Sequence, residues 1–363
     1  MIRIQNTAFA AIACLATAGM SFADSVPGFV FSLTNEVNNA VVMYERGTDG
    51  SLAQAGSYST QGKGTAAGLG SQSALALSED GRWLAAVNAG SNEVTLFSVN
   101  DDGLVFSGKA PSGGAMPISV TIARGLVFVV NAGGTPNILG FHIGRRGGLL
   151  PIPQSAQKLT GQAPAQIALN PQADTLVVTE KGTNTIETFA VDNGFVSAPV
   201  TQAAHGTTPF GFAFDRMGRI VVSEAFGGAA GQSAVSSYEI GDNGKINGLT
   251  GSLRTAQSAI CWIAIPRNGK YAYATNTGSA NLTGFSIAKD GSLSLLASNG
   301  INATLPEGSK PGDMAITPDG RFLYALSTGT GMISFYRIAA DGTLGSIASV
   351  GGLPLTAAGL VAR

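Results

Sequence analysis

Short runs of alternating apolar and polar residues, separated by glycine-rich turns, fill the chain from about residue 28 to its end. In AVNAGSNEVTLFSVNDDG, residues 86–103, one apolar run ends at Asn88, and a second run, containing Phe97, ends at an Asp-Gly turn. Nearly the same phrase returns as ATNTGSANLTGFSIAKDG at residues 274–291. Runs of this length and period indicate strands, and no helical periodicity accompanies them, so the pattern predicts antiparallel β-structure.

The phrase occurs seven times, about every 49 residues. Most copies have a further strand and turn before them and a short apolar segment after the Asp-Gly turn, which gives four strands per unit. This period predicts an all-β fold, a seven-bladed β-propeller with four antiparallel strands in each blade. The residues that end the second strand of each unit are called the anchor residues below: Asn35, Asn88, Asn131, Glu180, Glu224, Asn276 and Ser327.

The two ends of the chain complement each other. Before Asn35 there is room for the second strand of the first unit but not for its first strand. The C-terminal segment LPLTAAGLVAR, residues 353–363, resembles that missing strand, and its Pro354 is placed like Pro164 and Pro311 in other units. We therefore expect the C-terminal strand to complete the first blade, which leaves no open seam in the ring.

Residues 1–23 have the features of a signal peptide. Arg3 precedes a run of small and apolar residues that is too short to span a bilayer, and Ser21-Phe22-Ala23 provides small residues before a cleavage site. The sequence thus predicts an exported protein, periplasmic or secreted, whose residues 24–363 form a single propeller domain.

Charge and cysteine content exclude several classes of partner. The chain has 21 basic and 22 acidic residues, which gives no electrostatic reason to expect nucleic acid or an anionic membrane surface. Cys261 is the only cysteine after the leader, so no intrachain disulfide can form. No spacing of Cys and His predicts a metal site and no Gly-rich loop opens a helix, so we expect neither a metal nor a cofactor.

The propeller topology sorts the loops onto two faces. The anchor residues and the longer loops, residues 60–72, 227–232 and 300–310, belong to one face, the anchor face, and the Asp-Gly turns belong to the opposite, Asp-Gly face. Binding residues concentrate on variable loops over a rigid scaffold, and the central channel of a propeller is its default pocket. We therefore expect a site at the channel mouth on the anchor face.

Four residues are candidates for catalysis. Glu180 and Glu224 interrupt the run of Asn anchors in adjacent blades, and two carboxylates near one mouth could divide acid and base roles or share a cation. The alternative is that each accepts backbone hydrogen bonds at its strand end. His205 precedes the first strand of a unit and has a pKa range suited to proton transfer. Asp313 follows Pro311 at the start of another innermost strand.

Further residues are candidates for ligand binding at the same mouth. Trp262 offers an apolar platform, and polar groups around it suit a neutral, hydroxylated or cyclic small molecule better than a phosphorylated one. Asn anchors have a simpler alternative role, because Asn shapes turns through its side chain. The ligand-binding candidates are Gln166, Trp262, Asn131, Asn276, Lys181 and Ser119.

Two segments carry a family resemblance: KPGDMAITPDGRFLYALSTGTGMISFYRI, residues 310–338, and SALALSEDGRWLAAVNAGSNEVTLFSV, residues 73–99. They resemble the lactonase-type seven-bladed propellers, the family of propeller 6-phosphogluconolactonases and carboxy-muconate cyclases, and the resemblance extends over the chain after the leader. It implies the same fold and a lactone hydrolase or cycloisomerase. In catalytic members, as the resemblance implies, Arg and His follow the proline of an innermost strand and Glu closes the next strand. Here APAQIALNPQADTLVVTE has Ala165 and Gln166 in place of that pair and keeps Glu180.

Two hypotheses of function follow. The first is an exported lactonase-like propeller that hydrolyses or isomerises a small lactone or cyclic acid at the channel mouth, with Glu180 as general base. The second is a non-catalytic propeller that binds a carbohydrate, a peptide or an envelope protein partner. The replaced Arg and His favour binding, whereas Glu180 and a second glutamate favour an enzyme.

Overall fold

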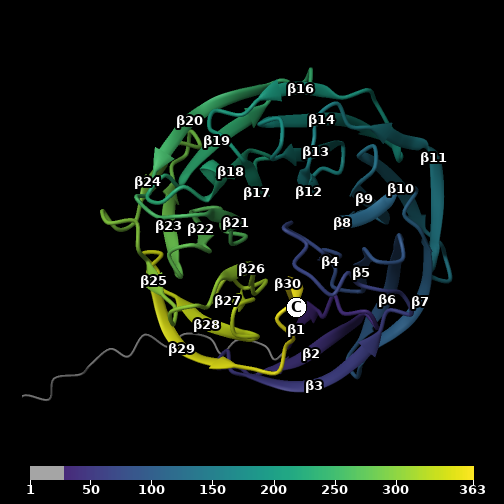
Figure 1. The fold of residues 1–363 in the computed structure, drawn as a ribbon, viewed down its shortest axis with the longest axis horizontal. Coiled ribbons are helices and arrows are strands. Elements are labelled where there is room, and N and C mark those ends of the chain that lie inside the picture. The colour runs from purple at the N-terminus through teal and green to yellow at the C-terminus, as the bar shows by residue number, and fades with distance from the viewer. Residues whose placement is uncertain (1–27) are drawn as a thin grey trace, which may run out of the picture.

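Seven antiparallel sheets are arranged as blades around a central channel in the computed structural model of the protein, which describes residues 28–363 (Figure 1). Each blade has four strand positions, although in blades 4 and 6 the outermost position is divided between two short strands. The predicted seven-bladed propeller is confirmed. The predicted leader, residues 1–23, lies outside the described residues.

The strands of each blade are given from the channel outwards. Blade 1 consists of β30 (Ala358–Ala362), β1 (Gly28–Leu33), β2 (Ala40–Arg46) and β3 (Leu52–Ser59), and blade 2 of β4 (Leu75–Leu77), β5 (Trp83–Asn88), β6 (Glu93–Asn100) and β7 (Gly103–Pro111). Blade 3 consists of β8 (Ala115–Ala123), β9 (Leu126–Gly133), β10 (Asn137–Ile143) and β11 (Leu149–Lys158). Blades 4 and 5 consist of β12 (Pro164–Leu169), β13 (Thr175–Glu180), β14 (Thr185–Asp192), β15 (Phe195–Val196) and β16 (Val200–Ala203); and β17 (Pro209–Phe214), β18 (Ile220–Glu224), β19 (Ala234–Ile240) and β20 (Ile246–Arg254). Blades 6 and 7 consist of β21 (Ile260–Ala264), β22 (Tyr271–Asn276), β23 (Asn281–Ile287), β24 (Leu293–Leu295) and β25 (Ala303–Thr304); and β26 (Pro311–Ile316), β27 (Phe322–Ser327), β28 (Met332–Ile338) and β29 (Leu344–Val350).

The ring closes within blade 1. The C-terminal strand β30 pairs antiparallel with β1, with Phe31 opposite Val361 and Ser32 opposite Leu360. The Ser32 hydroxyl also donates to the Gly359 carbonyl, at 2.9 Å. The predicted closure is confirmed, and the two ends of the described chain hold the ring together without a free seam.

The Asp-Gly turns have a common cause. At residues 290–292 the Asp290 carboxylate accepts hydrogen bonds from the Ser292 amide, at 3.0 Å, and from the Ser292 hydroxyl, at 2.7 Å. Gly291 between them has φ 86°, a left-handed conformation that glycine adopts without steric cost. The same chemistry recurs in the Asp-Gly phrases, which is why a strand ends at each of them.

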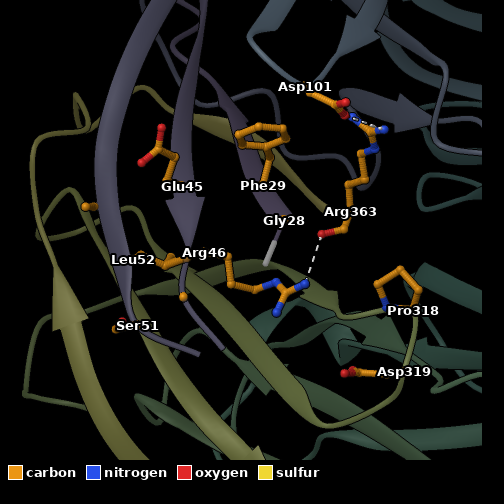
Figure 2. A pocket seen from close by; sticks show the side chains of 12 residues that line it. Gly28, Phe29, Glu45, Arg46, Ser51, Leu52, Asp101, Pro318, Asp319 and Arg363 are labelled. Carbon is orange, nitrogen blue, oxygen red and sulfur yellow. Dashed lines mark hydrogen bonds and ion pairs between the residues drawn. The ribbon is translucent and has the colours of Figure 1, made fainter. Parts of the chain in front are cut away.

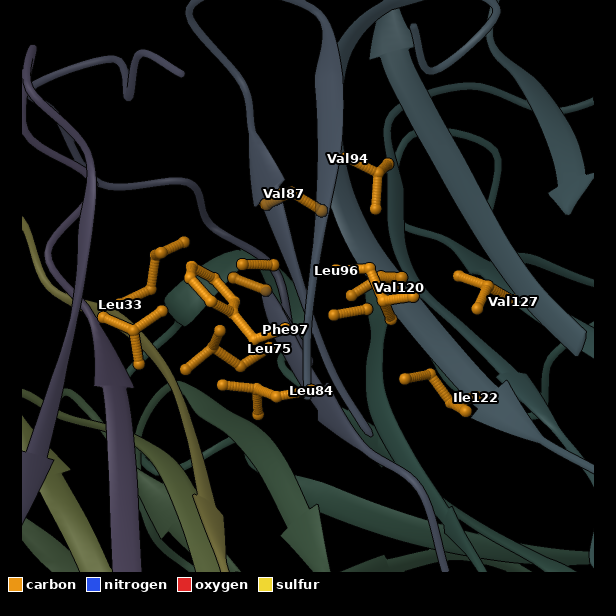
Figure 3. Close-up of a cluster of buried hydrophobic side chains, with 14 of the residues drawn as sticks. Leu33, Leu75, Leu84, Val87, Val94, Leu96, Phe97, Val120, Ile122 and Val127 are labelled. Carbon is orange, nitrogen blue, oxygen red and sulfur yellow. The ribbon is translucent and has the colours of Figure 1, made fainter. Parts of the chain in front are cut away.

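Apolar side chains from adjacent blades pack against each other and form the core. Between blades 1, 2 and 3, one buried cluster includes Leu33, Leu84, Phe97 and Val120 (Figure 3). Hydrogen bonds also join neighbouring blades. For example, the Tyr324 hydroxyl of blade 7 donates to the Gly50 carbonyl of blade 1 at 3.0 Å. Since every blade buries both of its faces in this way, the inner strands are held in fixed positions around the channel.

Helical structure contributes little. The one helical segment in residues 28–363 is a short 3-10 turn, η1 (Phe226–Gly228). Among these residues, no helix has the length and apolar character needed to cross a bilayer.

Candidate functional site

The anchor residues lie buried at the ends of the second strands, where they join strands to the connections between blades. The Asn88 side chain donates to the Thr95 hydroxyl, at 2.8 Å, and accepts from Asn39 and Thr60 of blade 1, at 2.9 and 2.6 Å. Asn276 donates in the same way to Thr283, at 2.8 Å. These contacts explain why Asn recurs at this position: its side chain forms hydrogen bonds with the third strand of its own blade and, for Asn88, with the neighbouring blade.

Asn131 follows this pattern only in part. Its side-chain amide donates to the Ser112 carbonyl at 2.9 Å, and its buried Oδ1 has no hydrogen-bond partner. The strand residue that corresponds to Thr95 is here the apolar Leu139. Asn131 therefore has one acceptor position that the described chain does not fill.

Two of the candidate ligand-binding residues form hydrogen bonds between neighbouring innermost strands. The Gln166 side chain accepts from the Phe212 amide, at 2.7 Å, and donates to the Phe212 carbonyl, at 3.0 Å. The Ser119 hydroxyl accepts from the Ile167 amide at 3.1 Å. Both side chains are buried, and they satisfy backbone groups on the open inner edges of β12 and β17.

Asp313 performs a similar task at the junction of blades 7, 1 and 2. Its carboxylate accepts from the amides of Ser73 and Gly359, at 3.1 and 3.0 Å. Burial raises the pKa of Asp313 to about 6, against the lowering effect of these hydrogen bonds and of one from Trp262. This carboxyl group sits deep in the channel and stabilises the closure of the ring.

The loop between β3 and β4 fills the channel mouth on the anchor face. Its residues 60–73, called the channel loop below, reach into the centre of the ring (Figure 1). The Gln72 backbone amide donates to the Ala165 carbonyl of blade 4, at 3.0 Å, and its side chain both accepts from and donates to Ile263 of blade 6, at 3.0 and 2.8 Å. Gln72 thus reaches across the channel on this face and satisfies backbone groups on the inner strand edges.

Trp262 and Lys181 hold the channel loop in place. The Trp262 indole donates to the Ser71 carbonyl at 2.9 Å, and the Lys181 ammonium donates to the Gly70 carbonyl. The Lys181 Nζ also lies 4.9 Å from the centre of the Phe210 ring, and burial lowers the pKa of this lysine. These two predicted ligand-binding residues therefore meet at the loop, with Phe210 and Cys261 packed beneath them.

Glu224 and His205 lie in blade 5, away from the channel loop. The Glu224 carboxylate accepts three hydrogen bonds, from the Gly206 amide at 2.8 Å and from the hydroxyls of Ser236 and Ser252 at 2.5 and 2.7 Å. The exposed His205 ring packs against Tyr238, with 4.7 Å between ring centres. Glu224 shares no hydrogen-bond partner with Glu180, so the structure does not bring the two predicted carboxylates together.

Glu180 has a different environment from Glu224. Its side chain is fully buried, its Oε2 accepts from the Thr185 hydroxyl at 2.8 Å, and its Oε1 has no hydrogen-bond partner. Burial, and to a lesser extent the charge of Glu187 on the adjacent strand, raise the pKa of Glu180 to about 7. Of the four candidate catalytic residues, Glu180 alone combines an unpartnered carboxylate oxygen with a pKa near neutrality.

Only a short stretch of backbone separates Glu180 from solvent on the anchor face. Gly161 lies so close to it that a Cβ there would overlap the carboxylate, and Gln162 joins Gly182 through a backbone hydrogen bond of 2.9 Å. Gln162, Gly182 and Thr183 are exposed on the anchor face. Glu180 is therefore one layer of backbone away from solvent, under a cover that consists of residues 160–163 and 181–183.

A comparison with models of protein families shows to which family the chain belongs. The profile described as "Lactonase, 7-bladed beta-propeller" matches residues 25–151, 148–225 and 221–354. The chain belongs to the lactonase propeller family. No curated protein sequence matches it.

Several solved propeller structures have the same fold as this chain. A periplasmic gluconolactonase from Pseudomonas aeruginosa is 16% identical with a TM-score of 0.73, over 93% of this chain and 99% of that one. A candidate 6-phosphogluconolactonase from Bacteroides fragilis is 18% identical with a TM-score of 0.71, over 93% and 98% of the two chains. The virginiamycin B lyase from Staphylococcus aureus is 14% identical with a TM-score of 0.53, over 76% and 83%. At these identities the likeness concerns the fold alone.

Two hollows open on the Asp-Gly face of this lactonase-family propeller. The smaller, about 440 Å³, lies in the channel between β4, β21, β26 and β30, with Met314, Ile316 and Leu360 among its apolar walls and Arg267 at its rim. The larger, about 950 Å³, lies beside Gly28, the first described residue, and includes Arg46 and Arg363 (Figure 2). The space in the channel is thus on the face opposite to the one that the sequence favours.

Within residues 28–363, no group of three or more His, Cys, Asp and Glu side chains is arranged to hold a metal ion. Buried Cys261 has its thiol pKa raised to about 12 by burial, which disfavours the reactive thiolate. The chemistry that this family member offers is therefore that of a carboxyl group with a neutral pKa, Glu180, and a half-buried ammonium group, Lys181.

Proposed function

We propose that the protein is a hydrolase of a small, uncharged lactone and that Glu180 is its general base. The observation that carries the proposal is the buried Glu180 carboxyl group with an unpartnered oxygen and a pKa of about 7. A general base is most effective when its pKa lies near the working pH. The family of the chain, and the gluconolactonase among its structural neighbours, point to a lactone as the substrate class.

In the proposed reaction, ionised Glu180 takes a proton from a water molecule whose oxygen attacks the lactone carbonyl carbon. The ring C–O bond then breaks, and the proton held by Glu180 passes to the departing ring oxygen, so that lactone and water give a hydroxy acid. Lys181 takes no part in this step, because its ammonium group points to the Gly70 carbonyl on the other side of the strand. The cover of residues 160–163 and 181–183 has to open for the substrate to enter. Glu224, His205 and Asp313 have no contact with Glu180 that would give them a part in this step.

We also propose that the protein acts after export, in the periplasm or outside the cell. The predicted signal peptide of residues 1–23 supports this, as does the periplasmic assignment carried by the Pseudomonas aeruginosa neighbour. A sugar phosphate of the cytosol is then an improbable substrate, and a neutral sugar lactone fits the uncharged surroundings better.

The test is a panel of five- and six-membered lactones, assayed with wild type and with Glu180→Gln. We expect turnover of at least one lactone and a loss of about 100-fold or more in kcat for the variant, because general-base catalysis contributes a factor of that order. Glu239→Gln, at an exposed glutamate on β19, is the matched control and should keep full activity. Equal activity of Glu180→Gln and wild type would exclude the mechanism.

One observation favours the second candidate, a non-catalytic binding propeller. The residues expected at the anchor-face mouth join innermost strands to each other, and the open part of the channel is the 440 Å³ hollow on the other face. On this hypothesis no lactone is turned over, while a neutral sugar or a small carboxylic acid raises the melting temperature of wild type. Arg267→Ala should then remove that rise, because Arg267 stands at the rim of the hollow.

A further inference from the structure

Five blades have a polar residue at a matching place on the third strand, opposite the residue two before the anchor; in blade 7 it is Ser334. In blades 2 and 6 it is Thr95 and Thr283, and in blade 5 it is Ser236. In blade 4 the same register position, opposite Val178, is Glu187. This position lies on the same side of the sheet as the anchor residue, so the two side chains face each other.

In three of these blades the facing pair has a donor and an acceptor. Asn88 donates to Thr95 and Asn276 donates to Thr283, and both threonine hydroxyls pass a hydrogen bond on to a backbone carbonyl, at 2.7 and 2.6 Å. In blade 5 the Ser236 hydroxyl donates to Glu224. Each of these three pairs is therefore joined by a hydrogen bond between its two side chains.

Blade 4 differs, because Glu180 faces Glu187 and two carboxylates contain no donor. Both side chains are fully buried, and each has one oxygen without a partner, Oε1 of Glu180 and Oε2 of Glu187. No lysine or arginine in residues 28–363 forms an ion pair with either glutamate. Two uncompensated charges at this depth are strongly unfavourable, so one of them has to be neutralised.

We propose that Glu180 and Glu187 form a carboxylic acid–carboxylate pair that shares one proton, carried by Glu180 Oε1 and donated to Glu187 Oε2. The hydrogen bonds decide which residue holds it. Oε1 of Glu187 accepts from the amide and the hydroxyl of Thr160 and from the Thr201 hydroxyl, three donors that stabilise an ionised group. Glu180 accepts from Thr185 and from the Gly161 amide.

No other charged group competes for this role. The neighbours that pack on Glu180 from the preceding loop and from β14 are Thr160, Gly161, Thr183 and Thr185, all uncharged. Lys181 follows Glu180 in the chain, but its Nζ donates to Gly70 on the other side of the strand. Glu187 is therefore the positioning residue that sets the charge of Glu180.

The inference rests on the proposed function and deepens it, because the pair places the charge of Glu187 beside the general base; the pair itself is tested without any substrate. The probe is a ¹³C NMR titration of glutamate Cδ groups. We expect one glutamate of wild type to titrate near pH 7, and we expect that signal to be lost in Glu180→Gln. In Glu187→Gln, which removes the charge of Glu187 and whose amide can donate to Oε1, the midpoint should fall below that of wild type, while the burial of Glu180 keeps it above the ordinary value for glutamate.

Stability against pH gives a second readout. Glu180 is protonated in the folded protein up to about pH 7 but only up to its ordinary 4.5 in the unfolded chain. Its contribution to stability is therefore complete below about pH 4.5 and is lost as the pH rises through 7. The midpoint of urea unfolding should fall between pH 5 and 8 in wild type, and this fall should be smaller in Glu187→Gln.

Glu187→Thr is the matched variant, because it gives blade 4 the residue that blades 2 and 6 already have. The two variants should give the same result in both measurements, so that either of them tests the pair if the other folds poorly. An unchanged midpoint near 7 in both variants, or no glutamate titrating near 7 in wild type, would overturn the pair. A wild-type titration that disappears on adding calcium, together with a higher melting temperature, would assign the site to a cation instead.

Discussion

Deletion of residues 358–363 is expected to abolish cooperative folding of the propeller at ordinary temperature. The deletion removes β30, the innermost strand of blade 1, and with it buried Leu360 and the hydrogen bonds to β1. Burial of one Leu contributes about 2 kcal/mol and each of several backbone hydrogen bonds about 1 kcal/mol. The sum, on the order of 5 kcal/mol, is comparable with the whole stability of many domains.

The expected loss has a second cause. Without β30, the apolar strand β1 presents an unpaired edge, which promotes association between chains. The measurement is a thermal melt by circular dichroism, together with the fraction of soluble protein. A synthetic peptide of residues 353–363 added to the truncated chain should restore the transition if the missing strand is the reason. A truncated chain that melts at the wild-type temperature would show that the ring does not depend on this closure.

Glu224→Ala is expected to destabilise the protein by roughly 3–5 kcal/mol at pH 8, since three buried donors lose their acceptor. These donors are the Gly206 amide and the Ser236 and Ser252 hydroxyls. Glu224→Gln keeps the size of the side chain and one acceptor oxygen, so a loss of only about 1–2 kcal/mol is expected. Urea unfolding measures both.

Glu180→Gln is the informative contrast to Glu224→Gln. At pH 8 it replaces a buried carboxylate that lacks one partner by an amide that can donate to Glu187, so it should not destabilise the fold. Opposite signs for the same substitution in adjacent blades would follow from the different hydrogen bonding of the two glutamates. A similar destabilisation by both variants would contradict this account.

The sequence predicts the fold because the fold repeats. The period, the Asp-Gly turns and the complementary chain ends together specify the blade count and its closure in blade 1, and the structure agrees with each of them. Five of the seven anchor residues are the last residues of their second strands, as the alignment of the units predicts, while Asn35 follows β1 by two residues and Asn131 lies two residues before the end of β9. Local patterns of this kind are sufficient when every unit meets the same neighbours.

The site is harder to predict, because its features are those that do not repeat. Nothing in the sequence of the channel loop shows that Gln72 turns inward, because this loop differs in length and sequence from the loops that join the other blades. Glu180 and Glu224 attract attention as a pair, but contacts between blades depend on side-chain direction, and each glutamate has its own set of partners. The placement of Glu187 opposite the residue two before Glu180 does have a sequence signal, a spacing of seven residues that recurs in Asn88 with Thr95 and in Asn276 with Thr283.

The central claim is that Glu180 is a base with a neutral pKa in a lactone hydrolase, and the pH dependence of kcat/KM tests it most directly. For the best lactone of the panel, kcat/KM of wild type should rise with pH through a midpoint near 7 and then level off, because only ionised Glu180 accepts a proton from water. In Glu187→Gln the midpoint should lie at a lower pH than in wild type, because the charge of Glu187 is removed. A profile that shows no change between about pH 5 and 8 in wild type, or the same midpoint in Glu187→Gln, would contradict the account.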